Sequence, residues 1–240
     1  MAAIIRFERK YRLTPAAYIN IRNHLSMLTS PDSFSAGERG GYPVRSLYFD
    51  TPDLAAYRER EEGLFGRIKL RLRVYSVDAA APQSVRVEIK TRSGALMEKH
   101  SSFTTYRNCL HLLERRSWID RSEPVLAEFE RLVRARNARP TLVVEYRREG
   151  LVARDGSSVR ITFDHGVQSM RATALYPMVG VAVPHRPRSV VLEIKTRGRP
   201  LPDWLEPLVR DHSLKLVSNS KYAQGIEATH GVLARRGGGG

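Results

Sequence analysis

Charged and apolar residues alternate along several segments of this chain. The sets that keep a two-residue period are Arg6, Glu8 and Lys10; Lys69, Arg71 and Arg73; Arg86, Glu88 and Lys90; Tyr146 and Arg148; Arg160, Thr162 and Asp164; and Glu193, Lys195 and Arg197. Because side chains alternate across a β-strand, each set shares one face of its strand. Guanidinium and ammonium groups bind phosphate oxygens through charge-assisted hydrogen bonds, so these faces predict a site for a polyanion.

A sheet with one solvated face is the alternative explanation of any single charged strand. A repeated segment favours a closed sheet instead. Residues Val87–Arg92 recur almost unchanged as Leu192–Arg197, so two distant strands carry the same Glu-x-Lys-x-Arg face. In a closed barrel those faces line the interior, where unpaired charges need a polyanion and a metal to complete them.

Carboxylates among the bases have two possible roles. They can hold a divalent cation that bridges phosphate oxygens during phosphoryl transfer. They can also simply neutralise neighbouring lysines. Both roles remain open for Glu8 and Glu88, and the cation role is favoured for Glu193.

Other catalytic machinery is missing from the sequence. There is no Gly-x-x-x-x-Gly-Lys-Ser/Thr phosphate loop and no Gly-x-Ser-x-Gly motif, and the 7 His residues form no metal-ligand pair at helical spacing. The single cysteine, Cys109, is expected to be an apolar filler in a helix. Single-stranded nucleic acid would need exposed aromatic platforms, and Tyr48, Tyr75 and Tyr146 are more often packing residues on strands.

Composition suggests a soluble protein with an anionic partner. The 240 residues include 40 Lys and Arg against 25 Asp and Glu, a net charge of +15, and are 42% hydrophobic.

We expect one domain over residues 1–234 and a disordered tail over 235–240. The first residues gain charge too quickly for a signal peptide, and no run of about 18 apolar residues occurs. A cytoplasmic location is therefore expected.

The elements that must position these residues follow from periodicity and turn residues. Strands are expected over residues 4–13, 44–50, 66–77, 84–92, 141–148, 159–164 and 189–197. Helices are expected over 15–28, 54–62, 104–114, 123–138 and 221–233, with turns at 78–82 and a loop over 31–41. The fold class is thus α+β and mainly antiparallel β.

An ordered set of motifs resembles a known family. The motifs are Phe7–Tyr11, Ser46–Pro52, Arg67–Tyr75, Glu88–Lys90, Tyr146–Arg148, Arg160–Asp164, Glu193–Lys195 and Ser220–Tyr222. Together they resemble the VTC domain, the polyphosphate polymerase module of the vacuolar transporter chaperone complex. That family belongs to the triphosphate tunnel metalloenzymes, which are related to CYTH domains. The resemblance implies a closed antiparallel barrel, the triphosphate tunnel, with helices outside and a C-terminal helix closing one end.

The resemblance also implies an activity and a site. The activity is transfer of the γ-phosphate of ATP onto a growing polyphosphate chain, assisted by Mn²⁺ or Mg²⁺. Carried over by motif, the catalytic residues are Arg71, Arg73, Lys90 and Arg148. The phosphate-binding residues are Lys10, Lys69, Arg160, Lys195 and Lys221. The metal ligands are Glu193 and Glu8. A separate membrane protein would have to couple synthesis to translocation.

One departure from the wider superfamily bears on the reaction. CYTH-type hydrolases and cyclases have Glu-x-Glu-x-Lys on the first strand, whereas this chain has Arg6 in place of the first Glu. Losing a carboxylate disfavours a two-metal hydrolase and favours the polymerase. The terminal oxygen of a phosphate chain is already anionic at neutral pH, so positioning and electrostatics can carry the rate without a general base.

Three other functions stay open at this stage. A tripolyphosphatase would release orthophosphate without chain growth. A non-catalytic polyphosphate- or nucleotide-binding module would be stabilised by its ligand without turnover. Non-specific RNA binding would depend steeply on salt and show no preference for polyphosphate.

Overall fold

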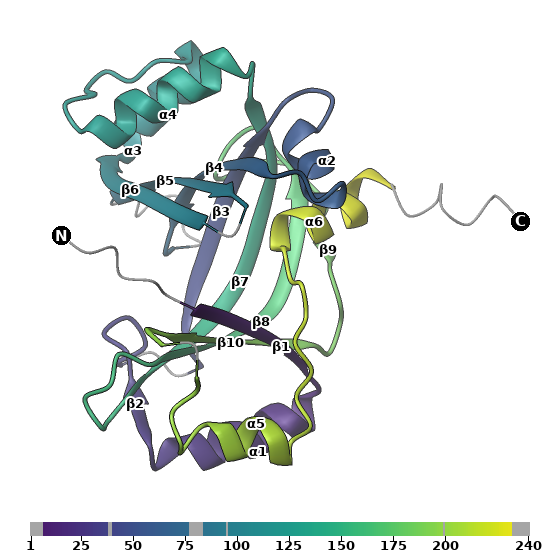
Figure 1. Ribbon diagram of the computed structural model, residues 1–240. Coiled ribbons are helices and arrows are strands. Elements are labelled where there is room, and N and C mark those ends of the chain that lie inside the picture. The colour runs from purple at the N-terminus through teal and green to yellow at the C-terminus, as the bar shows by residue number, and fades with distance from the viewer. Residues whose placement is uncertain (1–6, 38–39, 77–83, 95, 199, 232–240) are drawn as a thin grey trace, which may run out of the picture. The chain divides into compact units, whose positions relative to one another are not determined.

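The computed structural model describes residues 7–37, 40–76, 84–94, 96–198 and 200–231. Figure 1 shows the elements, which in chain order are β1 (Phe7–Leu13), α1 (Pro15–Ser26), β2 (Thr29–Pro31), β3 (Tyr42–Asp50), α2 (Ala55–Glu61), β4 (Gly66–Val74), β5 (Ser84–Ser93), β6 (Leu96–Thr105), α3 (Tyr106–Arg115), α4 (Pro124–Ala135), β7 (Arg139–Ala153), β8 (Arg160–Arg171), β9 (Val183–Pro184), β10 (Val190–Thr196), α5 (Glu206–Asp211) and α6 (Lys221–His230). The predicted helices are present, with ends shifted by a few residues.

The strands form one antiparallel sheet. Its hydrogen-bonded order is β1-β10-β8-β7-β3-β4-β5-β6, with β2 paired to β7 and β9 paired to β8. The prediction of an α+β fold dominated by antiparallel strands is therefore confirmed. Within the described part of the chain this order ends at β1 and at β6, so the closed barrel stays a prediction.

Contacts group the chain into two compact units. The first unit comprises Met1–Pro43, Tyr146–Val167 and Arg186–Asn219, and the second comprises Val44–Glu145, Gln168–His185 and Ser220–Gly240. A single domain over residues 1–234 remains a prediction. The turn expected at 78–82, the side chain of Arg6 and the tail over 235–240 lie outside the described residues.

The first unit packs α1 and α5 against the apolar side of β1, β8 and β10. Helix α1 starts where the side chain of Thr14 accepts the N–H of Ala17 at 3.2 Å, and a proline at its first position suits a first turn. Ile21 and Leu25 of this helix are fully buried in the same cluster as Ile161 and Leu192. Alternation therefore sends the charged residues of these strands to the opposite face.

The second unit uses the same division between faces. Leu72 of β4 and Val87 of β5 are fully buried in a cluster with Leu112 of α3 and Phe129 of α4. Figure 1 shows these two helices beside β5 and β6. Cys109 of α3 lies in this cluster as the expected apolar filler, and burial raises the pKa of its thiol to about 12. The basic residues of β4 and β5 are left on the other face.

The sequence missed one long strand, β6. It pairs with β5 along its whole length, from Ser84 opposite Thr105 to Ser93 opposite Leu96. Its residues are mostly polar and keep no clear apolar alternation, so backbone pairing rather than burial specifies it. The short elements β2, β9 and α5 were missed as well, because segments of two to six residues carry little periodicity.

No helix within the described ranges has the length and apolar character needed to span a membrane.

Two leucines on α3 allow a matched test of the second unit's core. Leu112 is 2% exposed and Leu110 is 39% exposed. We expect Leu112→Ala to lower the free energy of unfolding by about 2–5 kcal/mol because it leaves a cavity. Leu110→Ala should change it by less than about 0.5 kcal/mol. Chemical denaturation measures both, and equal losses in the two variants would contradict the packing described here.

Candidate phosphate-binding site

The first unit carries a charged face on three adjacent strands. We call it the lysine–glutamate face; its members are Glu8, Lys10, Arg160, Thr162, Glu193 and Lys195. Strand register places Lys10 opposite Glu193 and Glu193 opposite Thr162. The next row places Glu8 opposite Lys195 and Lys195 opposite Arg160. Residues far apart in the sequence thus share one surface.

Glu193 is the buried centre of this face, with 5% of its surface exposed. Its Oε1 lies 2.8 Å from Lys195 Nζ and its Oε2 lies 3.9 Å from Lys10 Nζ. Burial raises the pKa of Glu193, but the hydrogen bond with Glu8 and the charges of Lys195 and Lys10 outweigh it and hold the pKa well below its usual value. Glu193 is therefore an anion at neutral pH.

Lys10 is held between two carboxylates. Its Nζ lies 3.2 Å from Glu8 Oε1 as well as near Glu193. Burial lowers the pKa of Lys10, yet the two glutamates raise it above its ordinary value. The ammonium group is therefore kept charged, and two carboxylates are brought within reach of each other.

A buried hydroxyl on this face lacks a partner. Thr162 is 2% exposed, and its Oγ1 makes no hydrogen bond within the described residues. Buried polar groups are nearly always hydrogen-bonded to protein or to an ordered water or ligand. Thr162 lies directly opposite Glu193, so this hydroxyl is part of the lysine–glutamate face.

Two arginines of the first unit are already engaged with aspartates. Arg148 donates from Nε to Asp164 Oδ1 at 2.6 Å and from Nη2 to Asp164 Oδ2 at 2.8 Å, and both residues are buried. Burial lowers the pKa of Arg148, but Asp164 and Tyr146 raise it well above its ordinary value. Arg160 donates from Nη2 to Asp32 Oδ2 at 2.7 Å. These carboxylates fix the two guanidinium groups in position.

The second unit carries a more basic face on β4, β5 and β6. We call it the arginine–lysine face; its members are Lys69, Arg71, Arg73, Arg86, Glu88, Lys90 and Lys99. Lys69 lies opposite Lys90, and Lys90 lies opposite Lys99, so three lysines stand in one row. Like charges directly opposite one another destabilise a sheet unless other groups compensate them. Here Glu88 pairs with Lys99, and Ser220 accepts a hydrogen bond from Lys69.

Glu88 neutralises part of this face. Glu88 is 1% exposed and makes ion pairs with Arg71 and Lys99. Two more arginines lie near its carboxylate, Arg73 Nη1 at 3.7 Å and Arg86 Nε at 3.8 Å. Burial raises the pKa of Glu88, but Arg71, Arg73 and Lys99 outweigh it and lower the pKa far below its usual value. Of the two roles left open by the sequence, this geometry favours the neutralising one.

Helix α6 starts at the arginine–lysine face. Its N-cap residue, Ser220, accepts a hydrogen bond from Lys69 Nζ at 3.1 Å, and Lys221 follows as its first residue. The hydroxyl of Tyr222 donates to Asp50, and the rings of Tyr222 and Tyr48 stack 5.2 Å apart. Asp50 also accepts the N–H groups of Ala56 at 2.8 Å and Tyr57 at 3.1 Å. These contacts fix α6 to β3 and α2.

Tyr48 joins that anchor to the basic residues. Its hydroxyl accepts a hydrogen bond from Arg71 Nη1 at 2.9 Å. Burial raises the pKa of Tyr48, but the charges of Arg71, Arg73 and Lys69 outweigh it and lower the pKa to about 8. The sequence suggested Tyr48 only as a packing residue or a base-stacking platform, whereas its hydroxyl orients Arg71.

The predicted site residues divide between the two units. Glu8, Lys10, Arg148, Arg160, Glu193 and Lys195 belong to the first, and Lys69, Arg71, Arg73, Lys90 and Lys221 belong to the second. Sequence reasoning missed Lys99, which faces Glu88 from the unrecognised β6, and the pairing of Asp164 with Arg148. The two-residue period of Arg160, Thr162 and Asp164 placed the aspartate on the charged face and was the available signal that it belongs to the site.

Glu8 and Glu193 are the best-placed carboxylates for a cation. No group of three or more His, Cys, Asp or Glu side chains within the described ranges is arranged to hold a metal. Mg²⁺ commonly uses only one or two protein carboxylates and takes its other ligands from water and substrate phosphates. Glu8 and Glu193, which both lie beside Lys10 Nζ, at 3.2 and 3.9 Å, could supply that number of carboxylates.

The ion cluster around Glu88 predicts a pH-dependent stability effect. A depressed carboxyl pKa stabilises the fold above the unfolded pKa, about 4.5, and the effect disappears as the pH falls through the folded value. We expect Glu88→Gln to cost about 3–5 kcal/mol at neutral pH, because it leaves buried cations uncompensated. The deficit should shrink as the pH drops below 4.5.

An exposed glutamate provides the control. Glu128 pairs with Arg131 on the surface of α4, so Glu128→Gln should cost less than about 1 kcal/mol at any pH. Urea denaturation at neutral and acidic pH compares the two variants. A pH-independent deficit in Glu88→Gln would contradict the assigned charge state.

Comparisons with known proteins agree with this arrangement. The sequence model of the VTC domain matches residues 5–230. Among solved structures, a candidate adenylate cyclase from Bacillus halodurans has a TM-score of 0.54 and 14% identity over 90% of this chain and 94% of its own, so the two share a fold. No curated protein matches the chain.

Two further structures give weaker similarities. A candidate adenylate cyclase from Vibrio parahaemolyticus has a TM-score of 0.47 and 13% identity over 93% of this chain and 98% of its own. A protein from Pyrococcus horikoshii OT3 has a TM-score of 0.46 and 16% identity over 92% and 96%. Since the family match runs through both charged faces and covers nearly the whole chain, this protein belongs to the VTC domain family.

Proposed function

We propose that this protein is a polyphosphate polymerase that transfers the γ-phosphate of ATP onto a growing polyphosphate chain. The observation that carries the proposal is the excess of base on the arginine–lysine face, where Glu88 is the one carboxylate among six Lys and Arg side chains. A net positive face of this kind attracts a polyanion. Membership of the VTC domain family supports the same ligand class.

The two charged faces would have different tasks. On the arginine–lysine face, Arg71 is oriented by Tyr48 and Glu88, and Arg73 Nε donates to Ser46 Oγ at 3.1 Å. Side chains held this way can bind phosphate oxygens with little reorganisation, which favours the transition state of phosphoryl transfer. Lys221, at the start of α6, would bind the nucleotide end of the substrate.

The lysine–glutamate face would place the reacting phosphates. Lys10 and Lys195 would contact phosphate oxygens, and Glu8 and Glu193 would hold Mn²⁺ or Mg²⁺. When bound, that cation neutralises the charge that develops on the transferred phosphoryl group. We further propose that the strands close into the tunnel of this superfamily.

The transfer balances without a protein base. The terminal oxygen of the polyphosphate chain forms a bond to the γ-phosphorus of ATP, and the bond from that phosphorus to the β–γ bridging oxygen breaks. ADP leaves with the bonding electron pair, and no proton has to move. The residues of this chain therefore need only bind, align and neutralise charge.

An activity assay tests this proposal. The protein is incubated with ATP and Mn²⁺, and the products are resolved on a gel; we expect a ladder of polyphosphate. Arg71→Ala and Glu193→Ala should each lower the rate by at least about tenfold because each removes a charge-assisted contact. Arg131→Ala, which removes an exposed arginine paired with Glu128, should leave it unchanged.

The same assay separates the alternatives. Orthophosphate release from tripolyphosphate without chain growth would indicate a hydrolase. Ligand-dependent thermal stabilisation without turnover would indicate a binding module. A ladder of equal strength in Arg71→Ala and in the wild type would refute the assignment of this face.

The partnerless hydroxyl of Thr162 makes a second prediction. We expect Thr162→Val to weaken binding of tripolyphosphate by about 10- to 100-fold, the effect of losing one hydrogen bond to a charged group. The same change should leave the free energy of unfolding equal or higher, since it removes a buried unpaired polar atom.

Thr196 is the matched control. It is also buried, but its hydroxyl donates to Gly198 O at 2.7 Å and accepts from Arg9 Nη1 at 3.3 Å. Thr196→Val should therefore lower stability more than it lowers affinity. Calorimetry and thermal unfolding give both quantities for each variant. Unchanged affinity in Thr162→Val would remove this residue from the site.

A further inference from the structure

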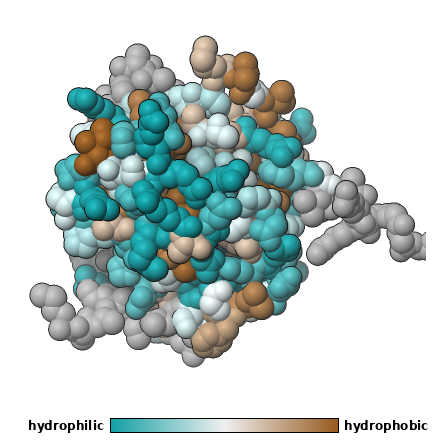
Figure 2. Space-filling view, turned by 90° about the horizontal axis from the view of Figure 1, so that it is seen from above, coloured by the Kyte–Doolittle hydropathy of each residue, from teal (hydrophilic) through white to brown (hydrophobic). Residues whose placement is uncertain are grey.

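A short apolar loop of the second unit projects into solvent. We call residues 177–182, between β8 and β9, the 177–182 tip. Met178, Val179 and Val181 are 101%, 86% and 82% exposed and are the three most exposed large apolar side chains in the described part of the chain. Figure 2 shows that the surface seen from above is mostly hydrophilic, with apolar side chains in separate groups. Neighbouring exposed apolar side chains of this kind are found at interaction sites.

Both ends of the 177–182 tip are anchored by contacts with the rest of the second unit. Leu175 is fully buried, and the hydroxyl of Tyr176 donates to Ser76 O at 3.1 Å. On the other side, Val183 pairs with Ser169, and His185 Nε2 lies 2.6 Å from Ser169 Oγ. The apolar side chains are therefore presented by an anchored loop.

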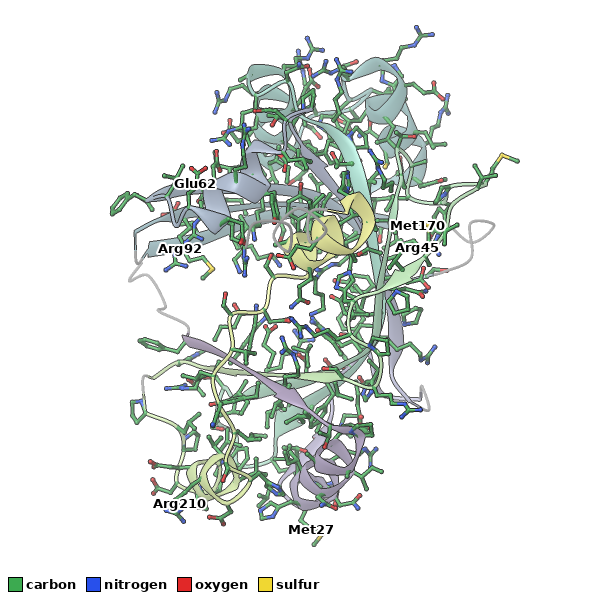
Figure 3. The ribbon with its side chains drawn as sticks, turned by 90° about the vertical axis from the view of Figure 1, so that its right-hand side faces the viewer. Met27, Arg45, Glu62, Arg92, Met170 and Arg210 are labelled. Atoms are coloured by element: carbon green, nitrogen blue, oxygen red, sulfur yellow. The ribbon has the colours of Figure 1, made fainter. Side chains whose placement is uncertain are left out.

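The tip also lies against β8 and near aromatic and basic groups. A Cβ atom at Gly180 would come within 3.4 Å of Met170 Sδ, so the loop folds back onto this strand. Arg45 lies over the ring of Tyr176 at 5.0 Å and is paired with Glu145. Figure 3 shows Met170 and Arg45 on the same side of the second unit.

The segment of the second unit that carries the tip has no acidic residue. Residues 168–185 contain no Asp or Glu but include Arg171. Arg171 is exposed at the end of β8, and Arg139 is exposed at the start of β7. These two strand ends are adjacent, because Ala172 N donates to Thr141 O at 3.3 Å. The one acidic side chain noted above, Glu145, is already neutralised by Arg45.

We propose that the 177–182 tip inserts into the surface of an anionic lipid bilayer. Three projecting side chains on a convex loop are too few for a stable protein interface, which needs about 800 Å² from each partner. They suit shallow insertion below the headgroups, with Arg171 and Arg139 beside anionic lipids. Apolar contact and electrostatic attraction are each weak alone and sufficient together. The inference does not depend on the proposed catalytic activity.

Vesicle sedimentation of the full chain tests the proposal. The vesicles contain phosphatidylcholine alone or with about one-third phosphatidylserine, and tripolyphosphate is present throughout to occupy the charged faces. We expect binding to the anionic vesicles, several-fold weaker binding to neutral ones, and weakening between about 0.1 M and about 1 M salt. Met178→Ser, Val179→Ser and Val181→Ser combined should reduce the binding several-fold.

Matched exposed residues provide the control. Met27, Phe65 and Ile119 are 80%, 73% and 59% exposed, so their combined substitution by Ser removes similar apolar surface elsewhere and should leave vesicle binding unchanged. As a second readout, the fluorescence of Val179→Trp should shift to shorter wavelength with anionic vesicles. No binding to anionic vesicles, equal binding by the tip variant, or no shift of the tryptophan would each overturn the proposal.

Discussion

Apolar burial on one side of each strand forces charged residues onto the other side. Lys69, Lys90 and Lys99 form one row across three strands, and Glu88 and Ser220 bind Lys99 and Lys69 within the protein. The register cannot slip to separate these lysines, because a one-residue shift would expose Leu72 and Val87, which are fully buried. The apolar cores therefore impose the basic face, which is the face that the proposed phosphate chain would bind.

Each of the two charged faces contains one buried glutamate of the repeated segment. Glu88 and Glu193 occupy the same place in the repeated Glu-Ile-Lys-Thr-Arg segment, yet their surroundings differ. Glu88 is enclosed by bases alone, so it lowers the net charge of its face. Glu193 and Glu8 both lie beside Lys10 Nζ, at 3.9 and 3.2 Å, and the strand neighbour Thr162 keeps an unused hydroxyl. This second arrangement is the one that the proposed cation would use.

Much of the fold could be predicted because alternation reports directly on strand faces. The charged sets on β1, β4, β5, β8 and β10 and the helices that cover their apolar sides were visible in the sequence. Strand β6 could not be predicted, because its polar residues are specified by pairing with β5. For the same reason Lys99, which lies on β6, was not predicted as a site residue. Turn residues and helical spacing gave the helix ends to within a few residues.

The partners of the site residues could not be predicted. Nothing local to Arg148 reveals that Asp164 will bind it through two hydrogen bonds, because that contact joins separate strands. The anchoring of α6 by Tyr222 and Asp50 joins residues 172 positions apart. Such contacts follow from register and packing, which a single sequence does not specify, whereas the charged faces follow from the alternation pattern alone.

The central claim is that the arginine–lysine face binds a phosphate chain. Titration calorimetry with tripolyphosphate and Mg²⁺ measures the affinity directly. The account predicts that Arg71→Ala weakens binding at least about tenfold, whereas Arg131→Ala, on the surface of α4, leaves it unchanged. Equal affinities of the wild type and Arg71→Ala would contradict it.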